Sequence, residues 1–495
     1  MARASLKSPS LGWRAAGLLG VGVLLSLAVY LGAAALTYRL GFPLDDAWIH
    51  QTYARNLAHF GQWAFYPGQV SGGSTAPLWS ALLAVGHLLG LGPYLGTFLL
   101  GGFFAWLLAL TAETVARQAS PDYRPRLPWV GLFFVFEWHL SWAAASGMET
   151  ILHAALVTLV LGMVLAGSQR FVLLGLLVGV SIWVRPDGVT LLGPLGVVIL
   201  ATRPSWRSRI HAFAGLFVGG GAVFIFYLLF NFWVAGTPWP NTFYAKQAEY
   251  ASLLNQPLLK RAADIFLLPL VGAGVILLPG LVWKIAQSIR TRNWAALAVL
   301  AWFVGYLGVY VLRLPVTYQH GRYIIPAMPV FFLLGLLGYV DWFQSSFKFP
   351  ARWVIDTTLK VSLVAVLVIF WALGAGTYGQ DVAVIESEMV DTAQWVAENI
   401  PPDALIAAHD IGALGYFANR PLIDLAGLVT PEVIPFIRDE ARLAAYMQSR
   451  GVVYLVTFPD WYPFLSQQYL PIYVSQAKFS PALGGENMTI YILTP

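Results

Sequence analysis

The chain of 495 residues contains no cysteine. This absence excludes disulfide bonds, thiolate metal ligands and cysteine nucleophiles. Charged side chains are also scarce: Asp, Glu, Lys and Arg make up only 11% of the residues, whereas hydrophobic types make up 58%. A soluble domain carries roughly a quarter charged residues. The composition therefore predicts a polytopic α-helical membrane protein.

Basic residues outnumber acidic ones by 29 to 24, but they do not gather in one polar domain. They occupy short loops between apolar segments, where the positive-inside rule explains them. Nucleic-acid binding, which favours a basic patch on a folded domain, is therefore not expected.

Apolar windows of about 20 residues indicate about 11 transmembrane helices. The first follows Arg3, Lys7 and Arg14, and we interpret it as an uncleaved signal anchor because it exceeds the usual apolar part of a signal peptide. Residues 77–92 are ambiguous between a further span and a helix in the membrane interface. The predicted spans lie near residues 15–36, 93–116, 127–145, 149–167, 171–185, 188–202, 211–235, 263–283, 294–312, 323–340 and 361–376.

Loop charge orients these spans. If residues 77–92 do not cross the membrane, most basic residues fall in loops on one side, which is then the cytoplasmic side. A crossing there would reverse this bias for every later loop, so we predict an interfacial helix. The inner basic residues are Arg3, Lys7, Arg14, Arg117, Arg124, Arg126, Arg170, Arg203, Arg207, Arg209, Lys284, Arg290, Arg292, Lys348, Arg352 and Lys360; the outer ones are Arg39, Arg55, Arg185, Lys246, Lys260, Arg261, Arg313 and Arg322.

The composition becomes more polar after residue 380. The helical segment "VAVIESEMVDTAQWVAENIPPDA" ends at Pro401 and Pro402, and short β-rich segments follow, with the helical "ARLAAYMQSRG" among them. These features predict a transmembrane domain at residues 1–380 and an α/β domain at residues 381–495. The predicted orientation places the second domain outside the cytoplasm.

Polar side chains that suit catalysis or phosphate binding gather in the outer loops. Arginine forms forked hydrogen bonds to phosphate. Arg185 and Arg322, with Lys246 and His320 on the same side, therefore predict a site for an anionic headgroup. These residues also have purely structural interpretations. The arginines could only extend toward lipid headgroups, and Glu149 could only cap the next span. The candidates are Asp45, Asp46, His50, Glu149, Arg185, Asp187, Asn241, Tyr244, Lys246, His320 and Arg322.

The adjacent acids Asp45 and Asp46 have two interpretations. Asp45 can cap the helix that begins near Ala47, while Asp46 favours the N-terminal dipole of that helix. Alternatively, one of them is a general base, because a neighbouring carboxylate and partial desolvation raise the basicity of the other. Apolar residues at helical spacing from Ile49 to Phe60 let this helix lie at headgroup depth.

The ordered set of motifs resembles the GT-C superfamily of integral-membrane glycosyltransferases. The set consists of an acid pair after the first span, then "SGMET", "VRPDG", "PNTFYAK" and "HGRY", then an outer α/β domain with "HDIGALGYFANRPLIDLAGL". No single motif is specific. Across residues 10–430 the chain is similar to bacterial proteins related to mycobacterial arabinofuranosyltransferases. Met148, Thr150, Asp187, Phe243 and Tyr244 depart from the arabinosyltransferase form, which leaves the sugar open.

The resemblance implies an enzyme of the bacterial cytoplasmic membrane that uses a sugar on polyprenyl phosphate at the outer face. The acceptor would be a hydroxyl of a glycan, a lipid or a protein, and transfer would invert the anomeric carbon. Asp45 or Asp46 would act as general base, and we place Asp45 first because it precedes the helix and is freer to reach a cavity. The long C-terminal motif adds His409 and Asp410 as substrate-binding candidates.

A divalent cation is left open. The carboxylates of Asp45, Asp46 and Glu149, with Asp187, offer oxygen ligands for Mg²⁺, Mn²⁺ or Ca²⁺, although we do not expect an obligatory metal. Two other functions also compete. A transporter would place charges near the membrane midplane, whereas here they lie at span ends. A glycan-binding protein without catalysis would lose little when Asp45 is replaced.

Overall fold

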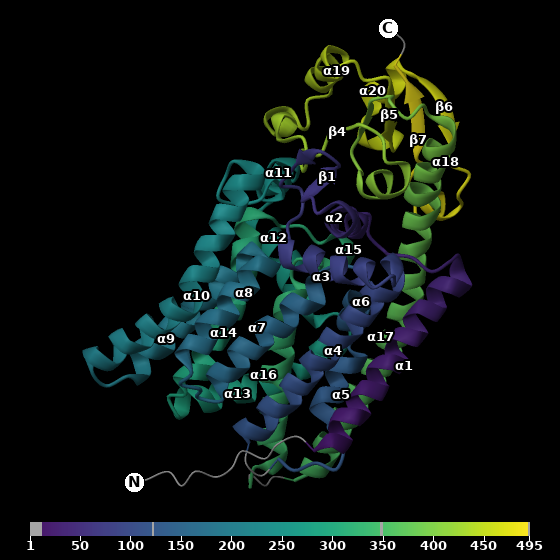
Figure 1. Cartoon of the computed structure of the whole chain (residues 1–495). Coiled ribbons are helices and arrows are strands. Elements are labelled where there is room, and N and C mark those ends of the chain that lie inside the picture. Colours follow the sequence, from purple (N-terminus) through teal and green to yellow (C-terminus); the bar gives the residue numbers. More distant parts are fainter. Residues whose placement is uncertain (1–11, 121–122, 347–349, 494–495) are drawn as a thin grey trace.

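The computed structural model describes residues 12–120, 123–346 and 350–493. Arg3, Lys7 and Lys348, which we predicted on the inner side, lie outside the described residues. Long helices stand side by side, and a small domain that contains strands sits on one end of them (Figure 1). The helices and the C-terminal strands agree with the predicted fold class.

Seven helical segments within the described residues are long and apolar enough to cross a membrane. Each predicted span overlaps one of these segments or shorter apolar helices, although the span predicted at residues 263–283 begins inside Leu258–Leu267 (α12) and ends inside Leu278–Arg290 (α13). The seven are Trp13–Thr37 (α1), Gly92–Ala119 (α4), Trp206–Ala235 (α10), Gly272–Arg290 (η4 and α13), Trp294–Arg313 (α14), Tyr318–Gln344 (α15, η5 and α16) and Arg352–Asn399 (α17, η6 and α18). The shorter helices are Trp129–Phe136 (α5), Trp138–Ala145 (α6), Thr150–Leu165 (α7), Phe171–Val184 (α8), Pro186–Leu191 (η1) and Leu192–Thr202 (α9).

The span predicted at residues 127–145 is two helices, α5 and α6, which meet at Glu137. The backbone of Glu137 is extended, and the Glu137 carboxylate accepts a hydrogen bond of 3.1 Å from Leu140 N, which caps α6. The other carboxylate oxygen lies 2.8 Å from His139 Nδ1. A buried acid therefore starts a second helix inside one apolar segment.

The ambiguous segment 77–92 forms the helix Pro77–Leu88 (α3) and the turn that follows it. Its 12 residues extend about 18 Å at 1.5 Å per residue, much less than a hydrocarbon core of about 30 Å. Together with Asp46–Phe60 (α2), it lies at the end of the bundle that carries the C-terminal domain (Figure 1). This geometry agrees with an interfacial helix.

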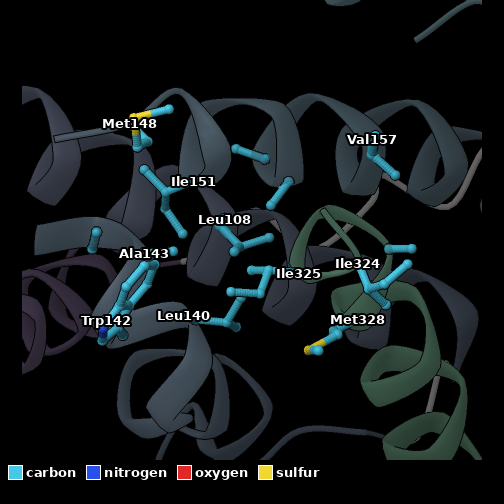
Figure 2. Close-up of a cluster of buried hydrophobic side chains, with 14 of the residues drawn as sticks. Leu108, Leu140, Trp142, Ala143, Met148, Ile151, Val157, Ile324, Ile325 and Met328 are labelled. Carbon is cyan, nitrogen blue, oxygen red and sulfur yellow. The ribbon is translucent and has the colours of Figure 1, made fainter. Parts of the chain in front are cut away.

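The centre of the helical part is tightly packed where α4, α6, α7 and α16 meet. Leu108, Trp142 and Ile151 point into one cluster together with Ile325 and Met328 (Figure 2), and all five side chains are almost fully buried. Lipid tails are as apolar as these side chains, so this cluster stabilises the fold mainly through van der Waals packing. This core fixes the loops that carry the polar motifs.

The last long helix leaves the bundle without a break. α17 (Arg352–Val384) packs along α1 (Figure 1) and continues through a π-helical turn, Ile385–Val390 (η6), into Asp391–Asn399 (α18). Arg39 anchors this exit through a 2.8 Å ion pair with Glu386. The change of composition near residue 381 therefore falls inside a continuous helix.

The C-terminal domain contains a five-stranded mixed sheet in the order β4-β3-β5-β7-β6. The strands β3, β4 and β5 are parallel, whereas β7 runs antiparallel to both β5 and β6. Each predicted β-rich segment contains one strand. The elements are Ile406–Ala408 (β3), Leu414–Ala418 (η7), Leu422–Asp424 (β4), Pro431–Phe436 (η8), Glu440–Ser449 (α19), Tyr454–Thr457 (β5), Pro459–Trp461 (η9), Pro463–Gln468 (α20), Leu470–Val474 (β6), Phe479–Ala482 (α21) and Thr489–Ile492 (β7).

Short elements fill the space between the two parts. The segment after α10 forms a helix that bears the "PNTFYAK" motif, and a strongly amphipathic helix follows it. These short elements are Ala64–Tyr66 (β1), Gln69–Val70 (β2), Asn241–Glu249 (α11), Ala251–Asn255 (η2) and Leu258–Leu267 (α12). The later elements of the helical part are Leu268–Leu270 (η3), Gly272–Leu277 (η4), Leu278–Arg290 (α13), Tyr318–Gly321 (α15), Ile325–Ala327 (η5) and Met328–Gln344 (α16).

Candidate active site

A cavity of about 300 Å³ lies between the helical part and the C-terminal domain. The start of α2, helix α11, the turn at α15 and the π-helical turn η6 line one side of it. The loops after β3, β4 and β5 line the other side, together with residues 480–486. Six of the predicted site residues meet here: Asp45, Asp46, Lys246, Arg322, His409 and Asp410.

Asp45 is bound by backbone amides from the C-terminal domain. Its carboxylate oxygens accept hydrogen bonds from Gly412 N at 2.6 Å and from Ala413 N at 2.8 Å. It stands at the N-cap position of α2 but makes no side-chain hydrogen bond to that helix. Asp45 therefore caps a helical turn that lies more than 360 residues away in the sequence.

Asp46 forms an ion pair with Arg322. The distance from its Oδ2 to Arg322 Nη2 is 2.5 Å, and 27% of its side chain is exposed. Only 7% of Asp45 is exposed. Asp46 is thus the more accessible acid, although we had expected Asp45 to be freer.

The two carboxylates have opposite pKa shifts. Burial raises the pKa of Asp45 to about 7, against the two backbone amides, and the negative charge of Asp46 adds to the rise. Burial alone would also raise the pKa of Asp46, but the cations Arg322 and Lys246 outweigh it and bring the value to about 2. At neutral pH Asp46 is therefore ionised, while both protonation states of Asp45 are populated.

A chain of polar contacts joins α11 to the C-terminal domain. Lys246 Nζ lies 3.1 Å from Glu249 Oε2, and Glu249 Oε1 lies 3.2 Å from His409 Nε2. The other ring nitrogen of His409 lies 2.7 Å from Tyr462 Oη. We did not predict Glu249 as a site residue from the sequence. Its position three residues after Lys246, which allows an ion pair on one helix face, is the feature of the sequence that indicates it.

Asp410 adds a third acid to the cavity. Burial and the nearby charge of Asp45 raise its pKa well above the ordinary value. Its Oδ2 atom is buried and has no hydrogen-bond partner among the described residues. Asp410 is therefore an unsatisfied polar group that faces a cavity.

Four other predicted site residues form a separate network at the bundle end and do not line the cavity within the described chain. Arg185 Nη1 lies 2.9 Å from Glu149, and its Nε lies 3.3 Å from Asp187. His50 Nε2 lies 3.5 Å from the other oxygen of Glu149. From the sequence we predicted Arg185 as part of a phosphate site, and in the structure its guanidinium is paired with two acids.

Tyr323 connects this network to the cavity. The guanidinium groups of Arg185 and Arg322 lie 5.6 Å and 4.9 Å from the centre of its ring. Its hydroxyl accepts a 3.0 Å hydrogen bond from Arg322 Nη2. Through Tyr323, the buried network around Arg185 therefore contacts Arg322, which lines the cavity.

The remaining predicted residues hold loops in place. Asn241 donates to Leu428 O at 3.1 Å, which ties α11 to the C-terminal domain. His320 lies 2.7 Å from Asp381 in a turn with positive φ. Tyr244 is half-buried and packs its ring against Phe243.

Asp45, Asp46 and Glu149, our candidate metal ligands, do not form one cluster, because Glu149 is bound to Arg185. Within the part of the chain that the structure describes, no group of three His, Asp or Glu side chains is arranged to hold a metal ion. The two aspartates remain at the cavity as oxygen donors.

Comparison with solved structures defines the fold class. ArnT from Cupriavidus metallidurans is 17% identical, with 97% of this chain and 98% of that chain covered and a TM-score of 0.61. An oligosaccharyltransferase from Archaeoglobus fulgidus is 11% identical, with coverages of 92% and 70% and a TM-score of 0.63. These likenesses confirm the predicted GT-C fold.

Other structures of these two proteins contain ligands. ArnT has been solved with undecaprenyl phosphate, at a TM-score of 0.57 to this chain. The archaeal protein has been solved with an inhibitory peptide and a dolichol-phosphate, also at 0.57. Residues 378–491 match a domain of unknown function (DUF8728). No curated protein sequence matches the chain.

Proposed function

We propose that this protein is a membrane glycosyltransferase that moves a sugar from a polyprenyl-phosphate donor to an acceptor hydroxyl. The observation that carries the proposal is one cavity in which Lys246 and Arg322 face the acid pair Asp45 and Asp46. The GT-C fold supports it, because structures with this fold have been solved with undecaprenyl phosphate and dolichol-phosphate. We place the reaction at the outer face of a bacterial cytoplasmic membrane, as the loop charges predict.

Arg322 and Lys246 would bind the donor phosphate. Arg322 is 7% exposed, and its Nη1 is buried with no partner among the described residues. A buried guanidinium with an unused donor is costly unless a ligand completes it. Lys246 supplies a second cation, which Glu249 holds in position. Both stabilise the charge that develops on the leaving phosphate.

Asp45 would be the general base. It would take the proton of the acceptor hydroxyl while that oxygen attacks the anomeric carbon from the face opposite the phosphate. The bond between the anomeric carbon and the phosphate oxygen would break, which releases polyprenyl phosphate and inverts the anomeric centre. A base works best when its pKa lies near the operating pH, and the pKa of Asp45 is about 7.

Asp46 would serve as the partner of Arg322 rather than as the base. With a pKa of about 2, its carboxylate has little affinity for a proton at neutral pH. Paired acids whose environments separate their pKa values commonly divide roles in this way. The amides of Gly412 and Ala413 each use one lone pair of Asp45, and a carboxylate has further acceptor sites for a hydroxyl.

A divalent cation is compatible with the same reaction. The two aspartates could supply oxygen ligands, and a structure of the archaeal relative was solved with Zn and sulfate. Such a cation would neutralise the leaving phosphate together with Arg322 and Lys246. Activity that chelator abolishes and Mg²⁺ or Mn²⁺ restores would establish this role.

The decisive experiment supplies purified protein with a panel of polyprenyl-phosphate sugars and follows lipid and product by mass spectrometry. We expect one donor to be consumed and free polyprenyl phosphate to accumulate when a cell-envelope extract provides acceptors. Asp45→Asn provides the inactive control. Donors that remain intact across the whole panel, while the protein binds polyprenyl phosphate normally, would refute glycosyl transfer.

A further inference from the structure

We propose that the acceptor is a saccharide, neutral or amine-bearing, that stacks on Trp461 and is hydrogen-bonded by Asp460 and Glu486. This inference rests on the proposed function and names its acceptor class. The three residues line the part of the cavity that the C-terminal domain provides. None of them was among our sequence candidates.

Trp461 has the properties of a fixed aromatic platform. It lines the cavity, yet 40% of its surface is exposed. Its ring lies 5.0 Å from the ring of His409 and 5.2 Å from that of Phe458. The C–H faces of a sugar ring are apolar, so stacking there removes apolar surface from water on both partners.

The support of this platform continues into the donor side. His409 is held by Glu249 at 3.2 Å and by Tyr462 at 2.7 Å. A ring packed against a side chain that is itself fixed loses little freedom when a ligand binds. The same Glu249 contacts Lys246, so acceptor platform and donor cation share one support.

The cations of the cavity come from one side only. Lys246 and Arg322 belong to the helical part, which also contributes Asp45, Asp46 and Glu249. Among the described lining residues of the C-terminal domain there is no Lys or Arg, and the ionisable acids there are Asp410, Asp460 and Glu486. Carboxylates make strong hydrogen bonds to hydroxyl and ammonium donors and repel anions. An acceptor with uronate or phosphate groups would therefore bind poorly.

Two unsatisfied groups indicate independently that the cavity receives a polar ligand. Asp410 Oδ2 and Arg322 Nη1 are both buried, and neither has a partner within the described chain. Arg322 is more than nine-tenths buried. The first group belongs to the C-terminal domain and the second to the helical part, so both sides of the cavity offer an unused hydrogen-bonding atom.

The direction of access favours a water-borne glycan. Asp460, Trp461 and Glu486 are exposed to solvent, and the domain that carries them sits beyond the end of the bundle (Figure 1). A lipid donor has to arrive from the membrane side, where Lys246 and Arg322 lie. The acceptor then enters opposite it, with its hydroxyl directed at Asp45.

The test measures binding of defined trisaccharides to the full-length protein in detergent by saturation-transfer NMR. The probes are a neutral hexose trisaccharide, a glucosamine trisaccharide, a galacturonic acid trisaccharide and a Ser-containing hexapeptide. We expect signals on the ring protons of the first two probes only. Trp461→Ala should weaken their binding by roughly tenfold or more, whereas Trp461→Phe should retain part of it.

Phe464→Ala is the matched control, because Phe464 is 48% exposed in the same domain and is not among the residues of the cavity. It should bind saccharides normally, and all variants should keep the wild-type Tm. Undecaprenyl phosphate should bind equally well to Trp461→Ala. The inference is wrong if no trisaccharide binds, if Trp461→Ala binds them normally, if the hexapeptide binds through Trp461, or if donor binding is lost instead.

The inference and the proposed function can fail separately. Saccharide binding that depends on Trp461, without sugar transfer from any donor, would refute the enzyme and retain the site. Sugar transfer to a lipid or peptide that is unaffected by Trp461→Ala would retain the enzyme and refute the saccharide acceptor.

Discussion

Arg322 Nη2 lies 2.5 Å from Asp46 Oδ2, and the same nitrogen donates to Tyr323. This contact joins the turn at α15 to the start of α2, and both line the side of the cavity that the helical part provides. Among the described residues the adjacent acid, Asp45, has no ion pair, and burial raises its pKa. The two neighbouring aspartates therefore have opposite pKa shifts.

The first prediction is a pH profile. Asp45 must be ionised to accept a proton, and its pKa is about 7, so kcat should be constant above about pH 7 and fall as the pH decreases below it. At pH values well below 7, kcat should fall nearly tenfold per pH unit, because the ionised fraction of Asp45 falls by the same factor. Steady-state kinetics from pH 5 to 9 will measure this profile.

The variant Asp46→Asn should shift this pH profile in a defined direction. The charge of Asp46 raises the pKa of Asp45, so its removal should move the acidic limb to lower pH. It should also weaken donor binding, because Arg322 loses its anchor. A profile that does not move in Asp46→Asn, or that has no acidic limb in the wild type, would contradict the assignment of the base.

Asp45→Asn should lower kcat by about 10²–10⁴-fold, the usual contribution of a general base. The substitution is not silent structurally, because one amide NH₂ must face Gly412 N or Ala413 N, both of which donate to Asp45. A Tm comparison is therefore needed. Turnover near the wild-type value in a folded variant would show that Asp45 is only a cap.

The second prediction concerns the donor phosphate. Lys246→Gln keeps a polar side chain on α11 but removes the charge, and affinity for undecaprenyl phosphate should fall about tenfold, since a charge-assisted hydrogen bond contributes roughly 1.5–3 kcal/mol. Lys260→Gln is the control, because the Lys260 side chain is 57% exposed and pairs with Asp264 one turn further along the same helix, α12. Equal affinities in the two variants would argue against Lys246 as a donor ligand.

Several features of the fold could be predicted from the sequence because they depend on local patterns. Apolar windows located the spans, and β-rich segments located all five strands of the main sheet. The acid pair, Lys246 and Arg322 were found because the loops predicted on the outer side gather side chains that suit catalysis or phosphate binding. These signals report the side of the membrane on which a residue lies.

Depth and pairing could not be predicted in the same way. Arg185 and Glu149 carry the same signal as Arg322, but they bind each other. The partners of Asp45 are backbone amides of Gly412 and Ala413, which no side-chain pattern reveals. Trp461 is one of 20 tryptophans, and only the three-dimensional arrangement shows that it faces the cavity.

The third prediction concerns the buried network. Arg185→Ala leaves Glu149 and Asp187 without their shared cation, and removal of one partner from a buried ion pair costs about 3–5 kcal/mol. The Tm should therefore fall by several degrees. Arg207→Ala, at an exposed position of α10, should leave the Tm unchanged. An unchanged Tm in Arg185→Ala would show that the network contributes little.

The fourth prediction is the topology. The chain has no cysteine, so single cysteines can be labelled cleanly. In intact cells a membrane-impermeant maleimide should label Ser449→Cys, on the exposed end of α19, whereas Arg124→Cys and Arg207→Cys should react only after permeabilisation. All three positions are exposed. Glu149 was also predicted outside, but it is buried and is unsuitable for labelling. Reaction of the residue-124 cysteine in intact cells would reverse the orientation.

The fifth prediction tests the backbone hydrogen bonds to the Asp45 carboxylate without a substitution of Asp45 itself. A Cβ atom at Gly412 would overlap the backbone carbonyl oxygen of Asp45 and come within 2.8 Å of its Oδ2, so Gly412→Ala must move the turn after β3 away from the acid. The two amides lower the pKa of Asp45, and their withdrawal should raise it further. The acidic limb of the kcat profile should then shift to higher pH, and kcat at pH 7 should fall.

Gly376→Ala is the matched control, because no atom lies within 4 Å of a Cβ there and alanine favours a helix interior by about 1 kcal/mol relative to glycine. It should leave the pH profile unchanged and keep or raise the Tm. If Asp45 were only a structural cap, Gly412→Ala would lower the Tm without moving the kinetic pKa. A shift of the acidic limb at an unchanged donor affinity requires instead that the proton be accepted at Asp45, because the substitution changes the environment of that carboxylate and leaves the cations on the opposite side of the cavity in place.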